Sequence, residues 1–362
     1  MKSIIINEHF LLGIWVFLIF ASMDSLTQIV LGAACGEIAL GKKIGNKALL
    51  FGAIGGTIPD LDVFIGKFLY NNEIQAMAFH RGFMHSILFT ILGCFLFGFI
   101  TFKLYNSGKR KETTTLKGWI WLFFLALFTH PILDCFTPYG TQLFAPFSDY
   151  RVAFNNISVV DPLYTLPFLI CMIIVLFYKR TNLKRLKWTK IGIYISSFYM
   201  VFTIGNKLHI DSVFKKSFKK AGISMNRFSA QPSILNNILW YAVAESDTQY
   251  HLAFYSLFDK SSTSEKMLHI NKNHDLIDMN DENLKTLAWF SNNYYRISKK
   301  DKIGTYQYTD LRYPMLNPDD LNTAVFNFTI FFGNNKWDIL PFNGNPPNKE
   351  EISKFTERFW GI

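Results

Sequence analysis

The sequence predicts a multi-pass α-helical membrane domain followed by a soluble, strand-rich α+β domain. Of its 362 residues, 50% are hydrophobic and only 18% are charged, and the mean hydropathy is +0.15. About a quarter of the residues in an ordinary soluble protein are charged. Long apolar runs occur only before residue 205, and shorter runs with strand-like alternation follow. We therefore expect an extension over 1–22, a membrane domain over 23–205 and a soluble domain over 206–362.

The N-terminal extension contains one apolar stretch, Phe10–Ala21. It is shorter than the roughly 20 residues that a membrane-spanning helix needs. The stretch can be a signal-anchor-like segment. Alternatively, natural translation begins at Met23, because MDSLTQ is a plausible protein start. The sequence leaves both interpretations open.

Six further apolar segments predict the membrane domain, so we expect about five to seven spans in all. The first two are rich in small residues, with Gly32/Gly36 and Gly52/Gly56 in GxxxG spacing, which favours close packing of helices. The segments are Leu26–Leu40, Ala48–Ile65, Met84–Phe102, Leu116–Phe136, Leu163–Tyr178 and Ile191–Ile204.

The distribution of basic residues predicts the orientation. Lysines and arginines concentrate in the loops 41–47, 103–117 and 179–190, which the positive-inside rule assigns to the cytoplasm. The loops 67–83 and 137–162, and the domain after residue 205, then face the other compartment. Because the net charge of +10 lies mainly in these loops, we expect a lipid bilayer and no nucleic acid as partner.

The cysteines indicate neither disulfides nor a thiolate metal site. The chain has four, and no two form a CxxC pair. Each lies in or at the end of an apolar segment, so we interpret them as apolar core residues. They are Cys35, Cys94, Cys135 and Cys171.

The second domain shows both strand and helix patterns. Alternation in TQYHLAFYSLF (248–258), KIGTYQYTDL (302–311) and AVFNFTIFF (324–332) predicts strands. DENLKTLAWFSNN (281–293) has helical spacing. Together these patterns predict an α+β domain.

Three clusters of ionisable residues stand at the ends of apolar segments: PDLD (59–62), HRGFMHS (80–86) and THPILD (129–134). Charges there are costly, and by default they indicate function. The orientation drawn from lysine and arginine alone places all three clusters at the same, non-cytoplasmic end of the helices.

The spacing within the clusters predicts local geometry. His130 and Asp134 are four residues apart and share one helical face. Pro131 between them predicts a kink or break. His80 and His85 are five apart, roughly 140° around a helix. We therefore expect His80 in a loop and His85 in the first turn of the next helix.

Imidazoles and carboxylates together are ligands of Zn²⁺, Mn²⁺ or Fe, and a catalytic site keeps one position for water, whose pKa the metal lowers. Arg81 and Arg151 can bind an anionic substrate, and Asp62 counts as both ligand and catalytic residue. Other interpretations stay open: helix-capping aspartates, an interfacial His80 and Arg81, a structural His130–Asp134 pair, and a loop pair of Arg151 with Asp149. The six candidate ligands are Asp60, Asp62, His80, His85, His130 and Asp134.

Several stretches resemble the bacterial inner-membrane metal-dependent hydrolase family, also described as LexA-binding, inner-membrane-associated hydrolases. The resemblance lies in MDSLTQIVLGAACGE (23–37), GTIPDLDVFIG (56–66), AFHRGFMHS (78–86), FTHPILDCFTPYGTQLFAPFSDYRVAFNNISVVDPLYTLP (128–167) and LNNILWYAVAESD (235–247).

This resemblance implies residence in the bacterial inner membrane, a metal site on the six candidates and hydrolase activity. The order of the motifs is more loosely similar to that of zinc-dependent phospholipase C, so zinc is the first choice of metal. Many relatives carry Thr-His where this chain has Thr27-Gln28, which leaves one or two ions open.

The leading hypothesis is a membrane-bound metal-dependent hydrolase. Metal-activated water would attack an ester or phosphoester of a small or lipid-like anionic substrate from the membrane or cell envelope. The alternative is a non-enzymatic regulator or scaffold whose C-terminal domain binds a protein partner. LexA is cytoplasmic, however, and the predicted orientation puts that domain on the other side. Ion transport would need ionisable residues through the whole membrane depth, whereas these residues gather at one end.

Overall fold

The structure is a computed structural model that describes residues 8–300, 302, 304–333, 336–340 and 347–362, with residues 8–24 as backbone only. The chain forms two compact units. The helical unit comprises Ala21–Phe68 and Phe79–Ile204. The sheet unit comprises Leu69–Ala78, Gly205–Ile362 and the described part of Met1–Phe20. Residues 1–7 lie outside the described residues, so the two interpretations of the extension stay open.

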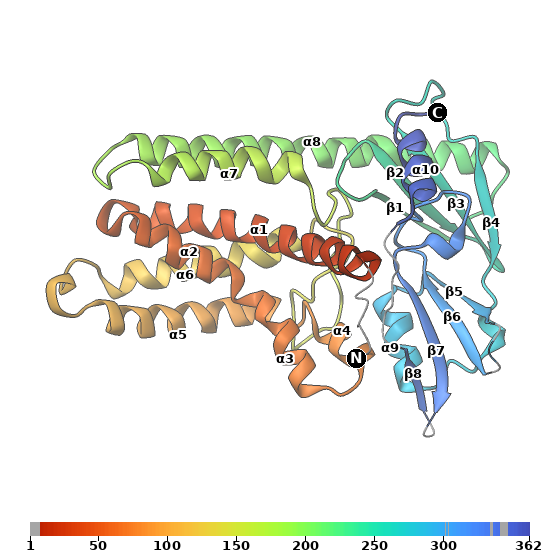
Figure 1. The fold of residues 1–362 in the computed structure, drawn as a ribbon, viewed down its shortest axis with the longest axis horizontal. Coiled ribbons are helices and arrows are strands. Elements are labelled where there is room, and N and C mark those ends of the chain that lie inside the picture. Colours follow the sequence, from red (N-terminus) through yellow and green to blue (C-terminus); the bar gives the residue numbers. More distant parts are fainter. Residues whose placement is uncertain (1–7, 301, 303, 334–335, 341–346) are drawn as a thin grey trace, which may run out of the picture. The chain divides into compact units, whose positions relative to one another are not determined.

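The helical unit is built from long helices joined by short turns and one long loop (Figure 1). Its last helix, α8, continues into the sheet unit. The elements are α1 (Glu8–Ile44), α2 (Asn46–Thr57), the 3₁₀ turn η1 (Pro59–Leu61), α3 (Asp62–Leu69), the 3₁₀ turn η2 (Phe83–His85), α5 (Ile87–Tyr105), α6 (Leu116–Asp134), α7 (Pro162–Leu176) and α8 (Lys184–Lys220).

Within the described part of the chain, two helices, α5 and α6, are long and apolar enough to cross a membrane. A third candidate is α2 together with Pro59–Leu69, a pair bent by 45°. The expected five to seven spans are therefore not supported within the described residues. α7 has only 15 residues, which is about 22 Å against a hydrocarbon core of roughly 30 Å. The stretch Ile191–Ile204 is only the apolar part of α8, between lysine-rich ends.

Of the predicted kink or break at Pro131, the break is wrong, because α6 runs without interruption to Asp134. The kink stays a prediction. A proline removes the backbone donor that would pair with the carbonyl four residues earlier, here that of Leu127. The Thr90 hydroxyl on α5 donates to the Leu127 carbonyl instead, at 3.3 Å. The neighbouring helix thus supplies the hydrogen bond that Pro131 removes.

The close packing that GxxxG spacing predicted is confirmed between α1 and α2. A β-carbon added to Gly32 would lie 2.4 Å from the Gly52 carbonyl oxygen, and one added to Gly52 would lie 2.2 Å from the Gly32 oxygen. At Gly56 the added carbon would lie 2.5 Å from the Gln28 oxygen. The two helices therefore meet backbone to backbone along a glycine seam, which we define as Gly32, Gly36, Gly52 and Gly56.

A buried ion pair joins α8 to α1. The Arg185 guanidinium on α8 donates to both carboxylate oxygens of Glu37 on α1, at 2.9 and 2.6 Å. It also donates to the carbonyls of Val175 and Tyr178, at 3.1 and 2.6 Å, at the end of α7. Glu37, an acidic residue within an apolar segment, thus has a structural partner.

The sheet unit contains two four-stranded antiparallel sheets, in the orders β1-β2-β3-β4 and β5-β6-β7-β8. The three predicted strands correspond to β3, β6 and β7, and the predicted helix is α9, which Asp281 caps. The elements are α4 (Glu73–Phe79), β1 (Arg227–Pro232), β2 (Leu239–Glu245), β3 (Gln249–Ser256), β4 (Met267–Asn271), α9 (Glu282–Phe290), β5 (Tyr295–Lys299), β6 (Thr305–Asp310), β7 (Asn327–Gly333), β8 (Lys336–Ile339) and α10 (Lys349–Phe359).

Each sheet packs against a helix. The first sheet places Trp240 and Ala242 against Phe214 and Phe218 of α8. The second packs against α9, and Ile74 of α4 joins that core.

All four cysteines of the chain are free and buried, as the sequence predicted.

Candidate metal centre

Three elements of the helical unit bring the candidate ligands together. Asp60 lies in η1, His85 lies in η2, and His130 and Asp134 lie one turn apart on α6. Pro59 begins η1, where the fixed φ of proline suits a helical start. Asp60 and Asp62 both have helical backbone, Asp60 in η1 and Asp62 at the start of α3.

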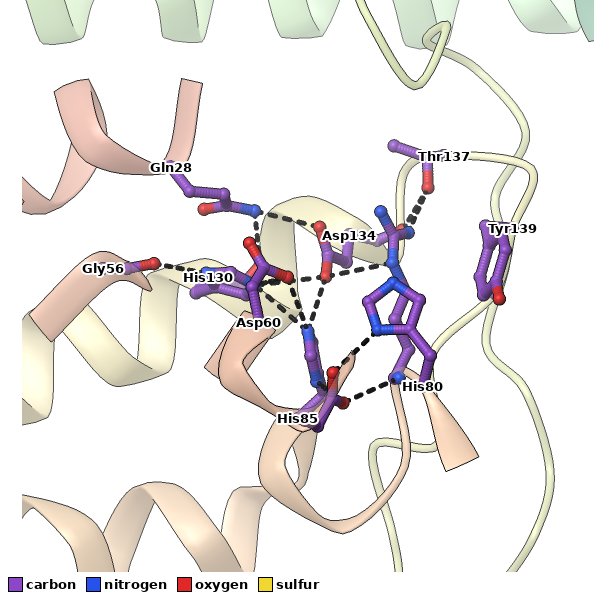
Figure 2. Close-up of polar contacts among 12 residues, drawn as sticks. Gln28, Gly56, Asp60, His80, His85, His130, Asp134, Thr137 and Tyr139 are labelled. Carbon is purple, nitrogen blue, oxygen red and sulfur yellow. Dashed lines mark hydrogen bonds and ion pairs between the residues drawn. The ribbon is translucent and has the colours of Figure 1, made fainter. Parts of the chain in front are cut away.

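Three ligand atoms, from Asp60, His85 and His130, lie within 4.8 Å of one another, and Asp134 lies beside the two histidines (Figure 2). The Nε2 atoms of His85 and His130 lie 3.1 Å apart. Both lie 3.4 Å from Asp60 Oδ1 and 3.4 Å from Asp134 Oδ2. Ligands on a tetrahedral zinc ion with bonds of about 2.0–2.1 Å are separated by about 3.3 Å. The cluster can therefore hold a metal ion with little rearrangement.

Burial and hydrogen bonding also fit a cation. His85, His130 and Asp134 are buried, whereas the Asp60 side chain is 22% exposed, so the cluster opens toward Asp60. Among the described residues, buried Asp134 Oδ2 accepts no hydrogen bond. Arg81 Nε lies 3.4 Å from this oxygen, and a bound cation would compensate its burial further.

Contacts behind the histidines orient them toward the cluster. His130 Nδ1 lies 2.6 Å from the Gly56 carbonyl oxygen. A carbonyl only accepts, so Nδ1 carries the proton and the Nε2 lone pair faces the cluster. His85 Nδ1 lies 3.0 Å from Asp62 Oδ2, an ion-pair contact that favours the same tautomer.

Asp62 and His80 lie beside the convergent atoms rather than among them. Asp62 Oδ1 lies 2.7 Å from His80 Nδ1, and Asp62 Oδ2 accepts from the Arg81 backbone N–H at 3.0 Å. As expected, His80 lies in a turn, and its side chain is 21% exposed. His85 lies in η2, two residues before α5 begins, and not in the first turn of α5 as expected.

The two loop histidines differ in their electrostatics. Burial lowers the pKa of His80 below its usual value, although Asp62 opposes the shift. Burial also acts to lower the pKa of His85, but hydrogen bonds to Asp60 and Asp62 outweigh it and raise the pKa. His85 therefore attracts either a proton or another cation, whereas His80 favours the neutral form.

Arg81 faces Asp134 and not the solvent. Its Nε lies 3.4 Å from Asp134 Oδ2, and its Nη1 donates to Thr137 Oγ1 at 2.7 Å. Its backbone has a φ of 59°, which is uncommon for a residue with a side chain. On the other side of Asp134, Gln28 Nε2 donates to Oδ1 at 2.9 Å. Both contacts hold the carboxylate in place.

Arg151 and Arg81 contact the same aromatic ring. The guanidinium carbons of Arg81 and Arg151 lie 4.9 and 4.8 Å from the centre of the Tyr139 ring. Arg151 also donates to the carbonyls of Tyr139 and Gly140, at 3.1 and 3.0 Å. Arg151 thus belongs to the loop beside the cluster.

Two groups that support the site were not identified from the sequence: the Gly56 carbonyl and the Thr137 hydroxyl. A backbone acceptor has no sequence signal of its own. Thr137 follows Asp134 by three residues, a spacing that places it one turn later.

Comparison with known proteins gives a family and two relatives. The family described as YdjM inner membrane protein matches residues 23–210. The Bacillus subtilis strain 168 protein YfhP, described as uncharacterized, is 33% identical over 147 residues, which are 39% of this chain and 42% of YfhP. The Escherichia coli K12 inner membrane protein YbcI is 33% identical over 123 residues, which are 32% of this chain and 64% of YbcI. The matches thus cover less than two thirds of either relative's length. No solved structure is significantly similar to the chain.

Proposed function

The chain belongs to the YdjM inner membrane protein family, and from this together with its His/Asp cluster we propose that it is a membrane-bound, metal-dependent hydrolase. Its location is the bacterial inner membrane, in agreement with the family and its apolar helices. The bond that we propose it cleaves is an ester or phosphoester.

One observation carries the proposal: the ligand atoms of Asp60, His85 and His130 lie 3.1–3.4 Å apart, with one side of the cluster exposed. Asp134 Oδ2 lies 3.4 Å from both histidines. A purely structural metal site is closed by its protein ligands, whereas a catalytic site keeps room for water and substrate. Here Asp60 is the partly exposed ligand, so the substrate would approach from its side. We assign the metal to Asp60, His85, His130 and Asp134.

A zinc ion bound there would lower the pKa of water and polarise the scissile group, and Mn²⁺ or Fe would be the alternatives. Asp62 orients His85 and fixes which nitrogen faces the ion. Gln28 and Arg81 hold Asp134 from two sides.

We assign proton transfer to the dyad of His80 and Asp62. His80 Nδ1 pairs with Asp62, and its partly exposed ring is kept neutral by a lowered pKa. A neutral imidazole backed by a carboxylate can accept a proton from the attacking water at Nε2 and return it to the leaving oxygen. Arg151, half-buried beside Tyr139, would attract an anionic substrate.

The test uses the full chain, purified without chelator and reconstituted in lipid nanodiscs. We expect stoichiometric metal by mass spectrometry, and hydrolysis of bis(p-nitrophenyl) phosphate or p-nitrophenyl acetate. His130→Ala should lose both metal and activity. His80→Ala should keep the metal and lose about 10²–10⁴ in rate. His209→Ala, at an exposed histidine of α8, is the matched control.

A parent protein without metal would overturn the metal assignment, and activity that survives in His130→Ala would overturn the mechanism. If stoichiometric metal is present but neither ester is cleaved, the alternative of a non-enzymatic regulator or scaffold is favoured.

A further inference from the structure

Helix α3 has its apolar side chains on the outside. Leu61, Phe64 and Phe68 lie at i, i+3 and i+7 on one face, and Phe64 and Phe68 are 71% and 89% exposed. The buried face carries Asp62 and Gly66. A helix in water shows the opposite arrangement, with the apolar face buried. Large apolar faces that stay exposed mark contact with a partner or a membrane.

A second apolar surface flanks the metal centre on the loop side. Phe83, Phe144 and Phe147 are exposed, and Phe147 is 85% exposed. The turn that carries the last two is held beside η2, because the Gln142 N–H donates to the Arg81 carbonyl at 2.9 Å. We call these six residues, Leu61, Phe64, Phe68, Phe83, Phe144 and Phe147, the apolar collar.

The collar adjoins the two partly exposed groups of the centre. Leu61 follows Asp60 directly, and Phe83 begins η2, three residues after His80. The polar, reactive groups are thus bordered by apolar side chains on both segments that carry them. A water-soluble substrate gains nothing from such a border.

The bilayer is the occupant that fits the collar. α3 continues from α2 in the bent candidate span, and the neighbouring candidate span α5 exposes Leu92, Phe95 and Leu96 along its length. In an inner-membrane protein these α5 side chains face lipid. α3 has eight residues, or about 12 Å of helix, too short to cross the membrane alone. An apolar face of that length suits the interface. The exposed Lys67 on α3 can reach anionic headgroups.

We propose that the collar inserts into the lipid interface and that the substrate reaches the metal centre from within the bilayer. The substrate class is an amphiphile whose acyl chains stay in the membrane while an ester or phosphoester of its headgroup lies at Asp60 and His80. This inference rests on the proposed hydrolase function. Hydrolysis adds one water across that bond: the hydroxyl joins the acyl or phosphoryl centre, and the proton passes through His80 to the leaving oxygen.

The first measurement addresses the surface and needs no activity. Nitroxide labels at Phe64→Cys and Phe147→Cys are examined in vesicles of phosphatidylethanolamine and phosphatidylglycerol by electron paramagnetic resonance. The native cysteines are buried, which limits background labelling. We expect both labels to be more accessible to oxygen than to a nickel chelate. A label at exposed Lys111→Cys should show the reverse. Nickel-accessible labels on the collar would overturn the insertion.

The second measurement addresses the substrate. Two hydrolysis rates are compared, that of a fluorogenic phospholipid in those vesicles and that of soluble bis(p-nitrophenyl) phosphate. Phe64→Ser/Phe68→Ser should lower the ratio of the first rate to the second. Because the variant removes two phenylalanines that would insert into lipid, this ratio should fall on the order of tenfold or more. Metal content should stay at the parent level. Phe177→Ser is the matched control, since this exposed phenylalanine follows α7 at the end of the helical unit away from α3 (Figure 1).

The outcomes separate the two proposals. Hydrolysis of the soluble ester with an unchanged ratio would overturn the lipid substrate and leave the hydrolase intact. Hydrolysis of neither probe would overturn the hydrolase and the lipid substrate together, whereas the labels would still decide whether the collar lies in the bilayer.

Discussion

His85 and His130 bring their Nε2 atoms to 3.1 Å of each other, although the two residues are 45 positions apart. Two imidazole nitrogens at this separation cannot direct lone pairs at each other without a positive charge between them, either a proton or a metal ion. Their common neighbours, Asp60 and Asp134, reinforce that requirement.

We therefore predict that metal binding stabilises the protein. Removing metal with a chelator should lower the unfolding midpoint in detergent, and adding Zn²⁺ should restore it. A ligand at 1,000 times its dissociation constant contributes about 4 kcal/mol. His130→Ala/Asp134→Ala should show no response to zinc, while His209→Ala should respond like the parent. A response in the double variant would place the ion elsewhere.

Asp62→Asn tests whether Asp62 binds the metal ion directly or only orients the histidines. Asp62 holds both His80 and His85 through their Nδ1 atoms. Loss of such a contact weakens metal affinity by about 10–100-fold, but the full stoichiometry should return at high zinc. Competition with a chromophoric chelator measures both quantities. If the stoichiometry falls as in His130→Ala, Asp62 binds the ion directly.

Thr90→Val tests the hydrogen bond that replaces the one Pro131 removes from α6. The variant removes the donor to the Leu127 carbonyl and should destabilise the protein by about 1–3 kcal/mol, because that buried acceptor is left unpaired. Thermal unfolding provides the measurement, with Thr101→Val on the same helix as control. Equal stability of the two variants would show that the carbonyl finds another donor.

Parts of the site follow from sequence spacing and parts do not. The helical i, i+4 relation predicted that His130 and Asp134 share a face, and their ligand atoms lie 3.4 Å apart. Which histidine nitrogen faces the cluster depends on the Gly56 carbonyl and on Asp62, contacts between segments that no spacing encodes. The absence of a break at Pro131 was likewise not predictable, because the donor that replaces its missing N–H belongs to α5. The span count was not supported within the described residues, because an apolar segment does not show whether its helix has the length and composition of a span, as α7 and α8 illustrate.

Arg185→Met tests the buried ion pair at the far end of the helical unit. Removing one member leaves the Glu37 carboxylate buried without its partner, and such losses cost about 3–5 kcal/mol. Glu37→Leu/Arg185→Met removes both charges and should recover part of that loss. A double variant as unstable as the sum of the two single variants would mean that the pair contributes no coupling.

The predicted orientation can be tested by labelling. In intact cells, a membrane-impermeant maleimide should react with Lys354→Cys on α10 and not with Lys111→Cys, both exposed positions. The physical basis is the concentration of basic residues in the loops 41–47, 103–117 and 179–190. The reverse pattern would place the sheet unit in the cytoplasm and make a cytoplasmic protein partner accessible.

The glycine seam is connected to the metal centre through Gly56. Gly56 belongs both to the contact with α1 and, through its carbonyl, to the orientation of His130. A methyl group at Gly52 or Gly56 would wedge the two helices apart and move that carbonyl with them. In a screen for inactive variants, alanine at these glycines would therefore resemble the loss of a ligand, although no atom of the ligand set had changed.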